Sequence, residues 1–514
     1  MLFLNNYLNH LDRKDNYFFR EQAMAFFKKE TKPESHFTTP RFPVHPLIDV
    51  VTGELMKCDK GDYVLNGGYS PHMAISGKNN SNKTLIILSF IMTFLIRFKD
   101  SGVDAQMFET ENTLEFMRCM QIAMGMCKIL GLNEEETGFI KEYILDNFTL
   151  RGSKDLGANA WYDEMNEISN GRIKANKDKV VLPFSDLRGK PVEVFVPHAV
   201  GLDSFSALEP ELVAEKYIEQ NTAGSADNNV MYLKEAGAKT QMLAKWLNQN
   251  PRAGIYMFSS AHMGDNISLD PRSPPEKKNL FMKQNHKLKN VPEKYYFYTT
   301  TMFFVNGASA LVNNDKVPIY PFNSGDKEKR DSKDILLEVI VLRNKFGQSG
   351  VFIPLIANQN MGIDWHLSAY HYCRQNKWGF TGNDQNYVLD LLPEVKLNRN
   401  VARTKLTEDS LLRRAVDITC EMNLLFRYKF DAIDAKYRCT PAELYEGIVE
   451  LGYDWNILLD KRGYYTLNHY EHPIKPLSTF DLLRMRVGDY IPYWMSEEEI
   501  PAQAKAIRDA KKTA

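Results

Sequence analysis

Residues 76–84, which read SGKNNSNKT, carry the residue types of a phosphate-binding loop. The usual pattern is G-x-x-x-x-G-K-[S/T], in which backbone N–H groups and the lysine bind phosphates and the hydroxyl binds Mg²⁺. Gly77, Lys83 and Thr84 match this pattern. Asn82 stands where the second glycine is expected, and asparagine is the residue after glycine that best tolerates a positive φ. The alternative is an ordinary polar turn between a strand and a helix.

Two acidic residues follow apolar segments at positions that suit such a site. Glu111 comes just after the apolar segment 105–109, and a carboxylate there can orient the attacking water or accept its proton. Glu109 competes for this role, and either residue can instead be a surface acid. Asp203 ends the apolar run VGLD and is predicted to hold Mg²⁺ beside Thr84, although many strand-to-loop junctions have this form.

Polar and basic residues also follow two later apolar segments. Ser260 and His262 end the segment GIYMFSSAH, where a side chain can sense the γ-phosphate. Ordinary polar residues at a strand end explain them equally well. Arg343 and Lys345 are separated by one residue, so an extended chain places both on one face. They are candidates to reach a neighbouring subunit's γ-phosphate, as an arginine finger does, and the alternative is a basic strand end.

The segment from His262 to Tyr296 shows no clear secondary-structure period between two predicted strands. Long insertions of this kind are usually functional. From residue 276 to 294 it has six lysines and two glutamates, with aromatic residues between them, which suits a phosphate backbone and stacked bases. A solvated charged loop is the alternative. The residues expected to contact DNA are Lys277, Lys278, Phe281, Lys283, Lys287 and Lys289.

Apolar strands and helices alternate from about residue 47 to 375, which predicts an α/β domain around a mostly parallel sheet. The expected strands span 72–76, 105–109, 192–196 with 200–202, 254–258, 297–305, 336–342 and 351–356. The expected helices span 84–98, 113–130, 134–147 and 230–248. These elements place the polar residues above at strand ends.

The chain is expected to have three regions. Residues 1–46 predict an N-terminal helical arm and connector, which can pack on its own domain or on a neighbouring subunit. Residues 47–385 form the α/β core, and 386–514 form a separate, mainly helical domain. In that last region, helices are predicted at 408–428, 440–451 and 497–512.

Composition limits the partners and the compartment. The net charge of −1 means that a polyanion must meet a local basic patch. Six cysteines without a C-x-x-C spacing indicate reduced thiols in the cytoplasm and no zinc site. The longest apolar run, 85–98, is too short to span a bilayer, so no membrane contact is expected. The histidines from His366 to His371 are assigned to core packing.

The order of these motifs resembles the RecA family of recombinase ATPases, including phage RecA-like proteins, over about residues 60–385. Matching stretches are GGYSPHMAISGKNNSNKT, FETENT, VGLDSFSALEPE, RNKFGQSG and NMGIDWHLSAYHYCRQNKWGF. The chain departs from the family at Asn82 and at Ser259-Ser260, where the family has an Asn-Gln or Asn-His pair. The last residues, AKAIRDAKKTA, do not resemble the family's acidic tail, and the C-terminal region has no match to the family.

The resemblance implies a RecA-like core that binds ATP and Mg²⁺, hydrolyses ATP when bound to DNA, and promotes strand exchange as a helical filament. Its partners would be single- and double-stranded DNA, further copies of itself, and single-strand-binding and mediator proteins. The family's DNA loops would map to about 218–229 and 263–296. The ATP-binding residues would be Gly77, Lys78, Asn79, Asn80, Ser81, Asn82, Lys83 and Thr84. The catalytic residues would be Glu111, Lys83, Arg343 and Lys345, the sensors Ser260 and His262, and the metal ligands Thr84 and Asp203.

Two other functions fit parts of the sequence. A hexameric DNA helicase of the DnaB type would share the ATP residues but form closed rings. A DNA-binding scaffold that does not hydrolyse ATP would explain Asn82 as a mark of a decayed loop.

Overall fold

The computed structural model describes residues 38–111, 113–152, 158–177, 179–208, 227–266, 275, 277–322, 333–383 and 385–513. Residues 40–185 and 191–514 form one compact unit, which contains every element described below. Most of the expected N-terminal arm, residues 1–37, lies outside the described residues.

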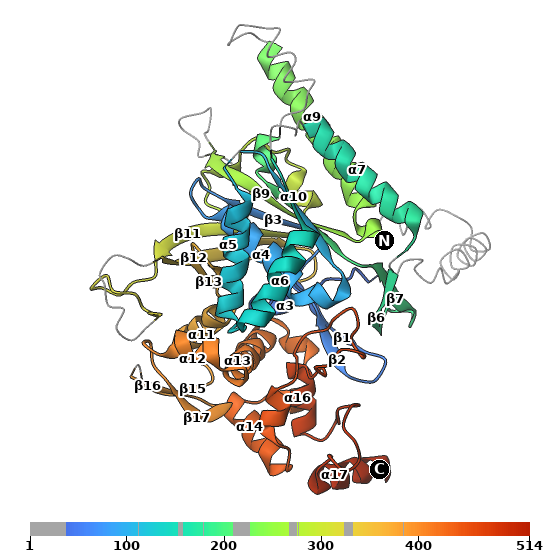
Figure 1. The fold of residues 1–514 in the computed structure, drawn as a ribbon, viewed down its shortest axis with the longest axis vertical. Coiled ribbons are helices and arrows are strands. Elements are labelled where there is room, and N and C mark those ends of the chain that lie inside the picture. Colours follow the sequence, from blue (N-terminus) through green and yellow to red (C-terminus); the bar gives the residue numbers. More distant parts are fainter. Residues whose placement is uncertain are drawn as a thin grey trace, which may run out of the picture. The chain divides into compact units, whose positions relative to one another are not determined.

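The unit is built on a sheet of ten strands in the order β14-β13-β12-β11-β3-β9-β8-β4-β5, with β10 paired to β9. Figure 1 shows this sheet, with β3, β9, β11, β12 and β13 labelled, and the helices around it. The strands are β3 (His72–Gly77), β4 (Asp104–Glu109), β5 (Phe148–Arg151), β8 (His198–Asp203), β9 (Ile255–Asp265), β10 (His286–Leu288), β11 (Thr301–Ala310), β12 (Asp334–Asn344), β13 (Phe352–Asn358) and β14 (Gly362–Ile363). Strands β11, β3, β9, β8, β4 and β5 are parallel to their neighbours in that order, whereas β12, β13 and β14 are antiparallel. The expected α/β class with a mostly parallel sheet is therefore confirmed.

Helices cover both faces of this sheet. They are α3 (Pro46–Thr52), α4 (Lys83–Phe98), α5 (Phe116–Ile129), α6 (Glu134–Asn147), α7 (Ala158–Ala175), α9 (Asp227–Gln249), α10 (Tyr295–Tyr298) and α11 (Trp365–Gln375). Alternate residues of each strand enter two hydrophobic cores, as a pleated strand requires. On β3, Met73 and Ile75 join the core of α4 and α5, whereas Ala74 joins that of α7 and α9.

Helix α4 lies very close to the sheet beneath it. A Cβ on Gly201 of β8 would lie 2.6 Å from Ile91 Cδ1 and 2.3 Å from Met107 Sδ. Only glycine permits this approach. Helix α4, which follows the loop at residues 78–82, therefore packs closely on the strand that ends in Asp203.

Two antiparallel hairpins flank the sheet, and the C-terminal region adds a third small sheet and more helices. The hairpins are β1 (Glu54–Lys57) with β2 (Tyr63–Asn66) and β6 (Lys179–Ser185) with β7 (Pro191–Phe195). The C-terminal elements are β15 (Phe380–Asn383), β16 (Asn386–Leu389), β17 (Leu392–Leu397), α12 (Ala402–Glu408), α13 (Ser410–Tyr428), α14 (Pro441–Glu450), α15 (Trp455–Leu459), α16 (Thr479–Arg486) and α17 (Ala502–Thr513). The boundary expected after residue 385 falls between β15 and β16, which pair with each other.

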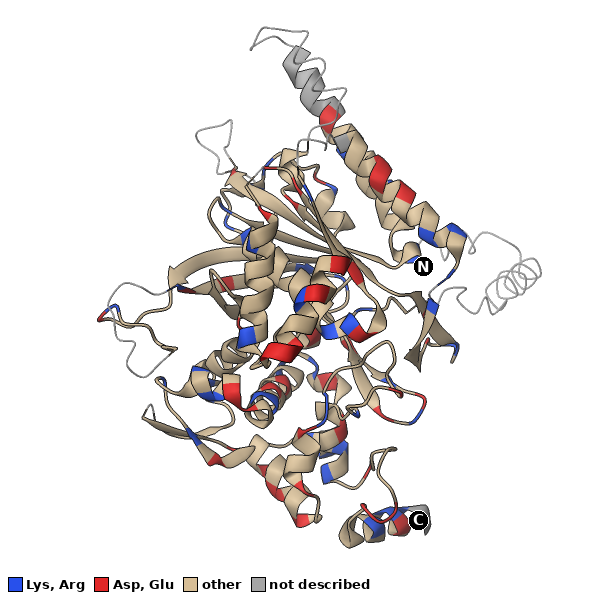
Figure 2. Ribbon diagram, in the orientation of Figure 1, with Lys and Arg blue, Asp and Glu red and all other residues tan. Residues whose placement is uncertain are grey.

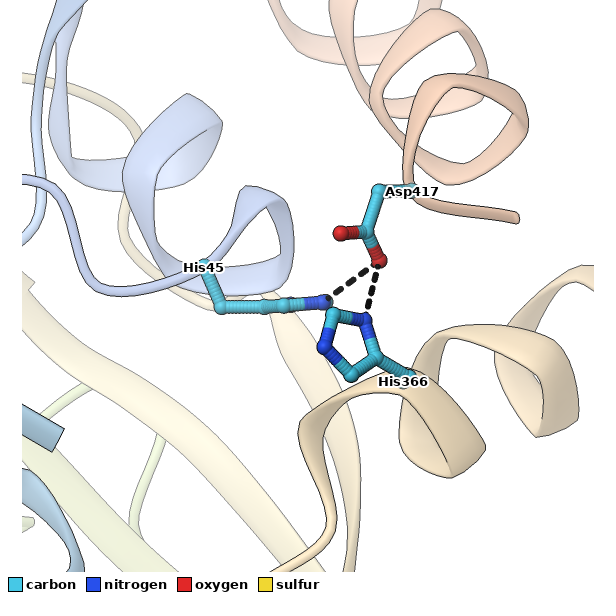
Figure 3. A group of neighbouring side chains, drawn as sticks. All are labelled: His45, His366 and Asp417. Atoms are coloured by element: carbon cyan, nitrogen blue, oxygen red, sulfur yellow. Dashed lines mark hydrogen bonds and ion pairs between the residues drawn. The ribbon is translucent and has the colours of Figure 1, made fainter. Parts of the chain in front are cut away.

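Three side chains tie the C-terminal helix α13 to the core (Figure 3). Asp417 Oδ1 lies 3.0 Å from His45 Nε2 at the start of α3 and 2.9 Å from His366 Nδ1 on α11. We call this group the His-Asp-His clamp. His371, on the same helix as His366, bonds to the hydroxyl of Tyr320 at 2.9 Å. The packing role expected for these histidines is confirmed.

Where the structure describes it, the segment expected to lack structure contains strand residues and buried side chains; residues 267–274 and 276 lie outside the described residues. β9 continues to Asp265, beyond its expected end, and β10 pairs with its last residues. Met282, His286, Leu288 and Tyr295 are buried against the sheet. The expected strand at 297–305 is partly wrong, because residues 295–298 form α10 and β11 starts at Thr301.

Two expectations from composition can be compared with the structure. All six cysteines are free thiols, and five of them are buried. Within the described part of the chain, no helix has the length and apolar character that crossing a bilayer requires.

Candidate nucleotide site

The loop between β3 and α4 has the backbone geometry that its sequence predicts. Asn80 and Asn82 both have positive φ angles, 58° and 60°. The prediction that the residue before the lysine adopts this conformation is confirmed. Gly77 is required for a different reason, because a Cβ there would lie 2.3 Å from Ser81 Oγ. The asparagines therefore occupy turn positions, and the glycine permits a close approach within the loop.

Lys83 lies at the first turn of α4 and folds back over the loop. Its Nζ donates a hydrogen bond to the backbone carbonyl of Lys78 at 2.9 Å. Ser81 Oγ donates to the same carbonyl at 2.7 Å, which fixes the curvature of the loop. Burial lowers the pKa of the Lys83 ammonium, and the carboxylates of Asp203 and Glu111 oppose this effect. A buried cation of this kind gains most from an anionic ligand.

Asp203 is held between the loop and β9. Thr84 Oγ1 donates to Asp203 Oδ2 at 2.6 Å, and Ser260 Oγ donates to Oδ1 at 2.9 Å. Burial raises the pKa of Asp203, and the two hydrogen bonds oppose this effect. The predicted metal ligands Thr84 and Asp203 are thus brought together, as the parallel pairing of β8 with β9 and β3 with β9 requires.

Glu111 and Glu109 have different environments. Glu109 is buried and accepts hydrogen bonds from the Glu111 backbone N–H at 2.8 Å and from Thr113 Oγ1 at 3.4 Å, so it shapes the turn. The Glu111 side chain is 39% exposed, and its Oε1 lies 2.8 Å from His262 Nε2. Partial burial raises the pKa of Glu111, but the hydrogen bond and charge of His262 and the charge of Lys83 outweigh it, so the pKa is lowered. Glu111 is therefore a carboxylate that faces the site.

These groups line one cavity of about 760 Å³. Its lining includes loop residues Asn79 to Thr84 together with Glu111, Asp203 and His262. The lining also includes Leu88, Leu114 and Ile122, which form its apolar wall. A second cavity, of about 420 Å³, has three carboxylates and no lysine or arginine in its lining, which does not suit a phosphate ligand. The larger cavity is thus the candidate nucleotide site.

Arg118, which sequence reasoning missed, also lines this cavity. Its guanidinium donates to Gln121 Oε1 at 2.6 Å, to Asn360 Oδ1 at 3.2 Å and to the carbonyl of Gln359. It is the one basic residue within the first ten residues of an otherwise mostly apolar α5, which is the only signal that the sequence offered. Lys289, predicted to contact DNA, lies in the lining of the same cavity.

The two sensor candidates bind different carboxylates. Ser260 and His262 lie on the same face of β9, so Ser260 reaches Asp203 and His262 reaches Glu111. Ser259 points to the opposite face, where its hydroxyl bonds to His72 at 3.0 Å and to the Tyr295 hydroxyl at 2.6 Å. Only Ser260 and His262 therefore belong to the site.

The lysine-rich segment is attached directly to strand β9, which carries the two sensor candidates. Lys287 pairs with Gly264 across the β9–β10 hairpin, and the Lys289 backbone N–H donates to the His262 carbonyl at 2.8 Å. Lys277, Lys278, Lys283, Lys287 and Lys289 are exposed, as is Phe281. Figure 2 shows acidic and basic residues interspersed over most elements. The segment from 276 to 294 differs, because its sequence has six lysines and two glutamates, so it is a local source of positive charge. The first expected DNA loop, 218–229, lies outside the described residues up to 226 and begins α9 after that.

Arg343 and Lys345 lie far from the loop along the sheet. Arg343 pairs with Met302 near the start of β11, and β11 runs parallel to β3, so both cations lie at the edge where β3 begins. The candidate phosphate-binding loop lies at the opposite edge, where β3 ends. Neither residue lines the cavity. Their role across a subunit interface stays a prediction.

No family model and no curated protein matches the sequence. The functional argument therefore depends on the geometry of the cavity and of the segments joined to it.

Proposed function

We propose that this chain is a Mg²⁺-dependent ATPase that assembles on single-stranded DNA and promotes pairing and strand exchange, as RecA-family recombinases do. The observation that carries the proposal is the convergence of Lys83, Thr84, Asp203 and Glu111 on one cavity beside a loop with the required positive-φ residues. Each of these groups has a separate task in phosphoryl transfer.

The phosphates of ATP would lie against the loop. The N-terminus of α4 directs backbone N–H groups and the positive end of the helix dipole at this position, and Lys83 adds a full positive charge. The apolar wall of Leu88, Leu114 and Ile122 would pack on the base. Arg118, which also lines the cavity and whose guanidinium is hydrogen-bonded to Gln121 and Asn360, would offer a planar cation for stacking on the base.

Thr84 and Asp203 fit Mg²⁺, because both present oxygen atoms, the ligands that this ion prefers, within 2.6 Å of each other. When bound there, the ion would neutralise charge on the phosphates. Ser260 holds the second oxygen of Asp203, which fixes the orientation of the carboxylate.

Glu111 is suited to orient the attacking water. It is ionised because its pKa is lowered, and it reaches the cavity from the end of β4. His262 holds one carboxylate oxygen, so a movement of His262 would change the position of Glu111. Hydrolysis and the conformation of β9 are linked by this contact.

DNA would act on the site through β9. The exposed lysines of the β9–β10 hairpin and of the segment before it can bind a phosphate backbone, and this hairpin begins directly after His262. Binding of DNA would therefore shift His262 and Glu111 together. Arg343 and Lys345 would contact the ATP of another copy, which makes assembly depend on ATP.

The test combines hydrolysis with imaging. ATP hydrolysis should rise with single-stranded DNA and be lost in Glu111→Gln, whereas Glu115→Gln, an exposed glutamate four residues later, should behave as wild type. Electron microscopy with DNA and an ATP analogue should show open helices. Closed six-membered rings would favour a helicase, and absent hydrolysis in the wild type would contradict the ATPase.

A further inference from the structure

A cavity of about 420 Å³ lies between four segments that are distant in the sequence, and it shares no lining residue with the candidate nucleotide site. The segments are the turn between β1 and β2, the turn after α4, strand β6, and residues 467–471 between α15 and α16. Figure 1 shows the β1–β2 hairpin beside the β6–β7 hairpin, and Cys58 and Phe184 form a bridge between them. We call this cavity the hairpin cavity.

The charged side chains that line the hairpin cavity are acidic. Asp59, Asp100 and Glu471 line it, and no lysine or arginine does. Asp100 Oδ2 lies 3.4 Å from Lys99 Nζ, whereas neither Asp59 nor Glu471 forms an ion pair with any residue that the structure describes. A cleft lined by charges of one sign concentrates counterions, so this cavity favours a cationic ligand.

A hydrogen-bond acceptor in the lining has no donor. Asn468 lines the cavity, and its Oδ1 is buried and has no hydrogen-bond partner within the described ranges. A buried polar atom without a partner costs free energy, which a donor in the cavity would offset. This acceptor and the three carboxylates together suit a ligand with N–H groups, such as an ammonium or a guanidinium.

The aromatic wall of the cavity already holds an ammonium group. Tyr470 lines the cavity, and Lys60 Nζ lies 4.4 Å from the centroid of its ring. The same Nζ lies 4.6 Å from the ring of Tyr493, and the two rings meet edge to face at 5.3 Å. An ammonium at this distance from an aromatic face is attracted by the ring. Lys60 is exposed and lies outside the lining, so it marks the kind of group that this wall binds.

The rest of the lining is mostly apolar. Leu182 and Leu467 are buried, and Val180, Val181 and Pro183 continue the wall along β6. The hydrocarbon stem of a lysine or an arginine packs on such a surface while its charged group stays near polar partners. An inorganic cation would make no use of this wall, so the lining fits an organic cation.

We propose that the hairpin cavity binds an ammonium or guanidinium group carried on a hydrocarbon chain. A basic side chain of a peptide and a free polyamine share this chemistry. Strand β6 favours the peptide, because it pairs with β7 along one edge and, among the described residues, its other edge is bonded only near Pro183 and Phe184. An extended peptide can pair with the free part of that edge and place a basic side chain in the cavity.

Titration calorimetry of the full chain, without nucleotide or DNA, tests the proposal. The probes are the peptide acetyl-Val-Arg-Val-amide, its neutral counterpart acetyl-Val-Gln-Val-amide, and spermidine. The wild type should bind the cationic peptide at least about tenfold more tightly than the neutral one, because hydrogen bonds that involve a charged group are the stronger ones. The titrations are made at low salt, since salt screens exposed charges.

Two changes at the cavity should act in opposite directions. The double variant Asp59→Asn, Glu471→Gln should bind the cationic peptide about fivefold more weakly, as expected for the loss of two exposed charge pairs. Lys60→Ala should bind it about two- to fivefold more tightly, because the tyrosine ring is vacated and a like charge is removed. The controls, which should bind as the wild type does, are at exposed residues outside the lining, Lys57→Ala and Glu498→Gln.

Three results would overturn the site: no binding of either cation by the wild type, equal affinity for the two peptides, or an unchanged affinity of the double variant. Binding of spermidine without binding of the cationic peptide would support the cation site and assign it to a free polyamine. Because Asp59 and Glu471 do not line the candidate nucleotide site, the result does not depend on the proposed ATPase.

Discussion

The candidate nucleotide cavity and the His-Asp-His clamp both contain a histidine bonded to a carboxylate, but the pair in the cavity is partly exposed and the pair in the clamp is largely buried. In each, a histidine nitrogen lies within about 3 Å of a carboxylate oxygen: 2.8 Å for His262 and Glu111, and 3.0 Å for His45 and Asp417. In the cavity, the Glu111 side chain is 39% exposed. In the clamp, His45 is 1% exposed and Asp417 14%. Residue types alone therefore do not distinguish a site from a structural cluster.

The hydrogen-bond pattern explains why the clamp is structural. His45, His366 and Asp417 are the ligand types of a metal site, and their ligand atoms lie within 4.8 Å of one another. However, His45 Nδ1 accepts a hydrogen bond from the Leu47 backbone N–H at 3.3 Å, so Nε2 carries the proton that Asp417 accepts. A metal on Nε2 would require the proton on Nδ1 and would break this bond. The clamp is satisfied without a ligand.

Replacement of Lys83 by alanine should cause the largest loss of ATPase activity and should not lower the stability that the clamp contributes. Loss of a group that stabilises transferred charge commonly reduces the rate by about 100- to 1000-fold. Stability should be unchanged or slightly higher, because burial already disfavours this ammonium and lowers its pKa. Steady-state ATPase assays and urea denaturation measure the two effects. Lys141→Ala, at an exposed lysine of α6, is the control. ATPase activity retained by Lys83→Ala would contradict the assigned site.

Replacement of Asp417 by alanine should lower the stability of the fold and leave nucleotide binding unchanged. It leaves the Nε2–H of His45 buried without an acceptor, and an unsatisfied buried donor costs about 1–3 kcal/mol of folding free energy. The free energy of unfolding should fall by about this amount, while the affinity of the folded protein for ATP stays the same. A fluorescent ATP analogue and urea denaturation measure these quantities. Weakened ATP binding at full folding would show that the two regions are coupled.

The stabilisation of the fold by Asp417 should depend on pH. Burial would raise the pKa of Asp417, but the charges and hydrogen bonds of His366 and His45 outweigh it, so the pKa lies well below its usual range. A depressed carboxyl pKa stabilises the fold above the unfolded-state value of about 4, and this contribution is lost as pH falls below it. The free-energy difference between wild type and Asp417→Ala should therefore be constant above about pH 5 and shrink below about pH 4. A difference that is unchanged down to pH 3 would exclude this role for Asp417.

The sequence predicted the elements of the cavity better than those of the clamp, for a physical reason. Gly77, Lys83 and Thr84 lie in one short loop, and Asp203 and Ser260 lie at ends of parallel strands, which meet at one edge of a sheet. Strand order alone therefore brought these residues together. The clamp joins residues 45, 366 and 417 through helix packing, which no local pattern specifies.

The largest errors also concern long-range packing. The segment at 277–298 shows no period because Met282, His286 and Leu288 anchor it individually to the sheet rather than through a repeating face. Arg118 lies in a helix without a local motif. Its place at the cavity depends on hydrogen bonds to Gln359 and Asn360, in the turn before β14, which are distant in the sequence. The packing of an irregular segment and the hydrogen bonds of a side chain to residues distant in the sequence are determined by the folded chain and not by a local pattern.

The smallest expected effect is that of Asn82→Gly, which tests the loop itself. Asn82 has φ 60°, which costs a non-glycine residue about 1–2 kcal/mol, and glycine removes this strain but is more flexible in the unfolded chain. These effects nearly cancel in stability. The Asn82 side chain makes no capping hydrogen bond, so its removal should keep ATPase activity or raise it by at most about fivefold, the change in rate to which 1 kcal/mol corresponds. Steady-state ATPase assays with and without DNA measure this. A collapse of activity would show that the Asn82 side chain contacts the nucleotide and is not a substitute for glycine.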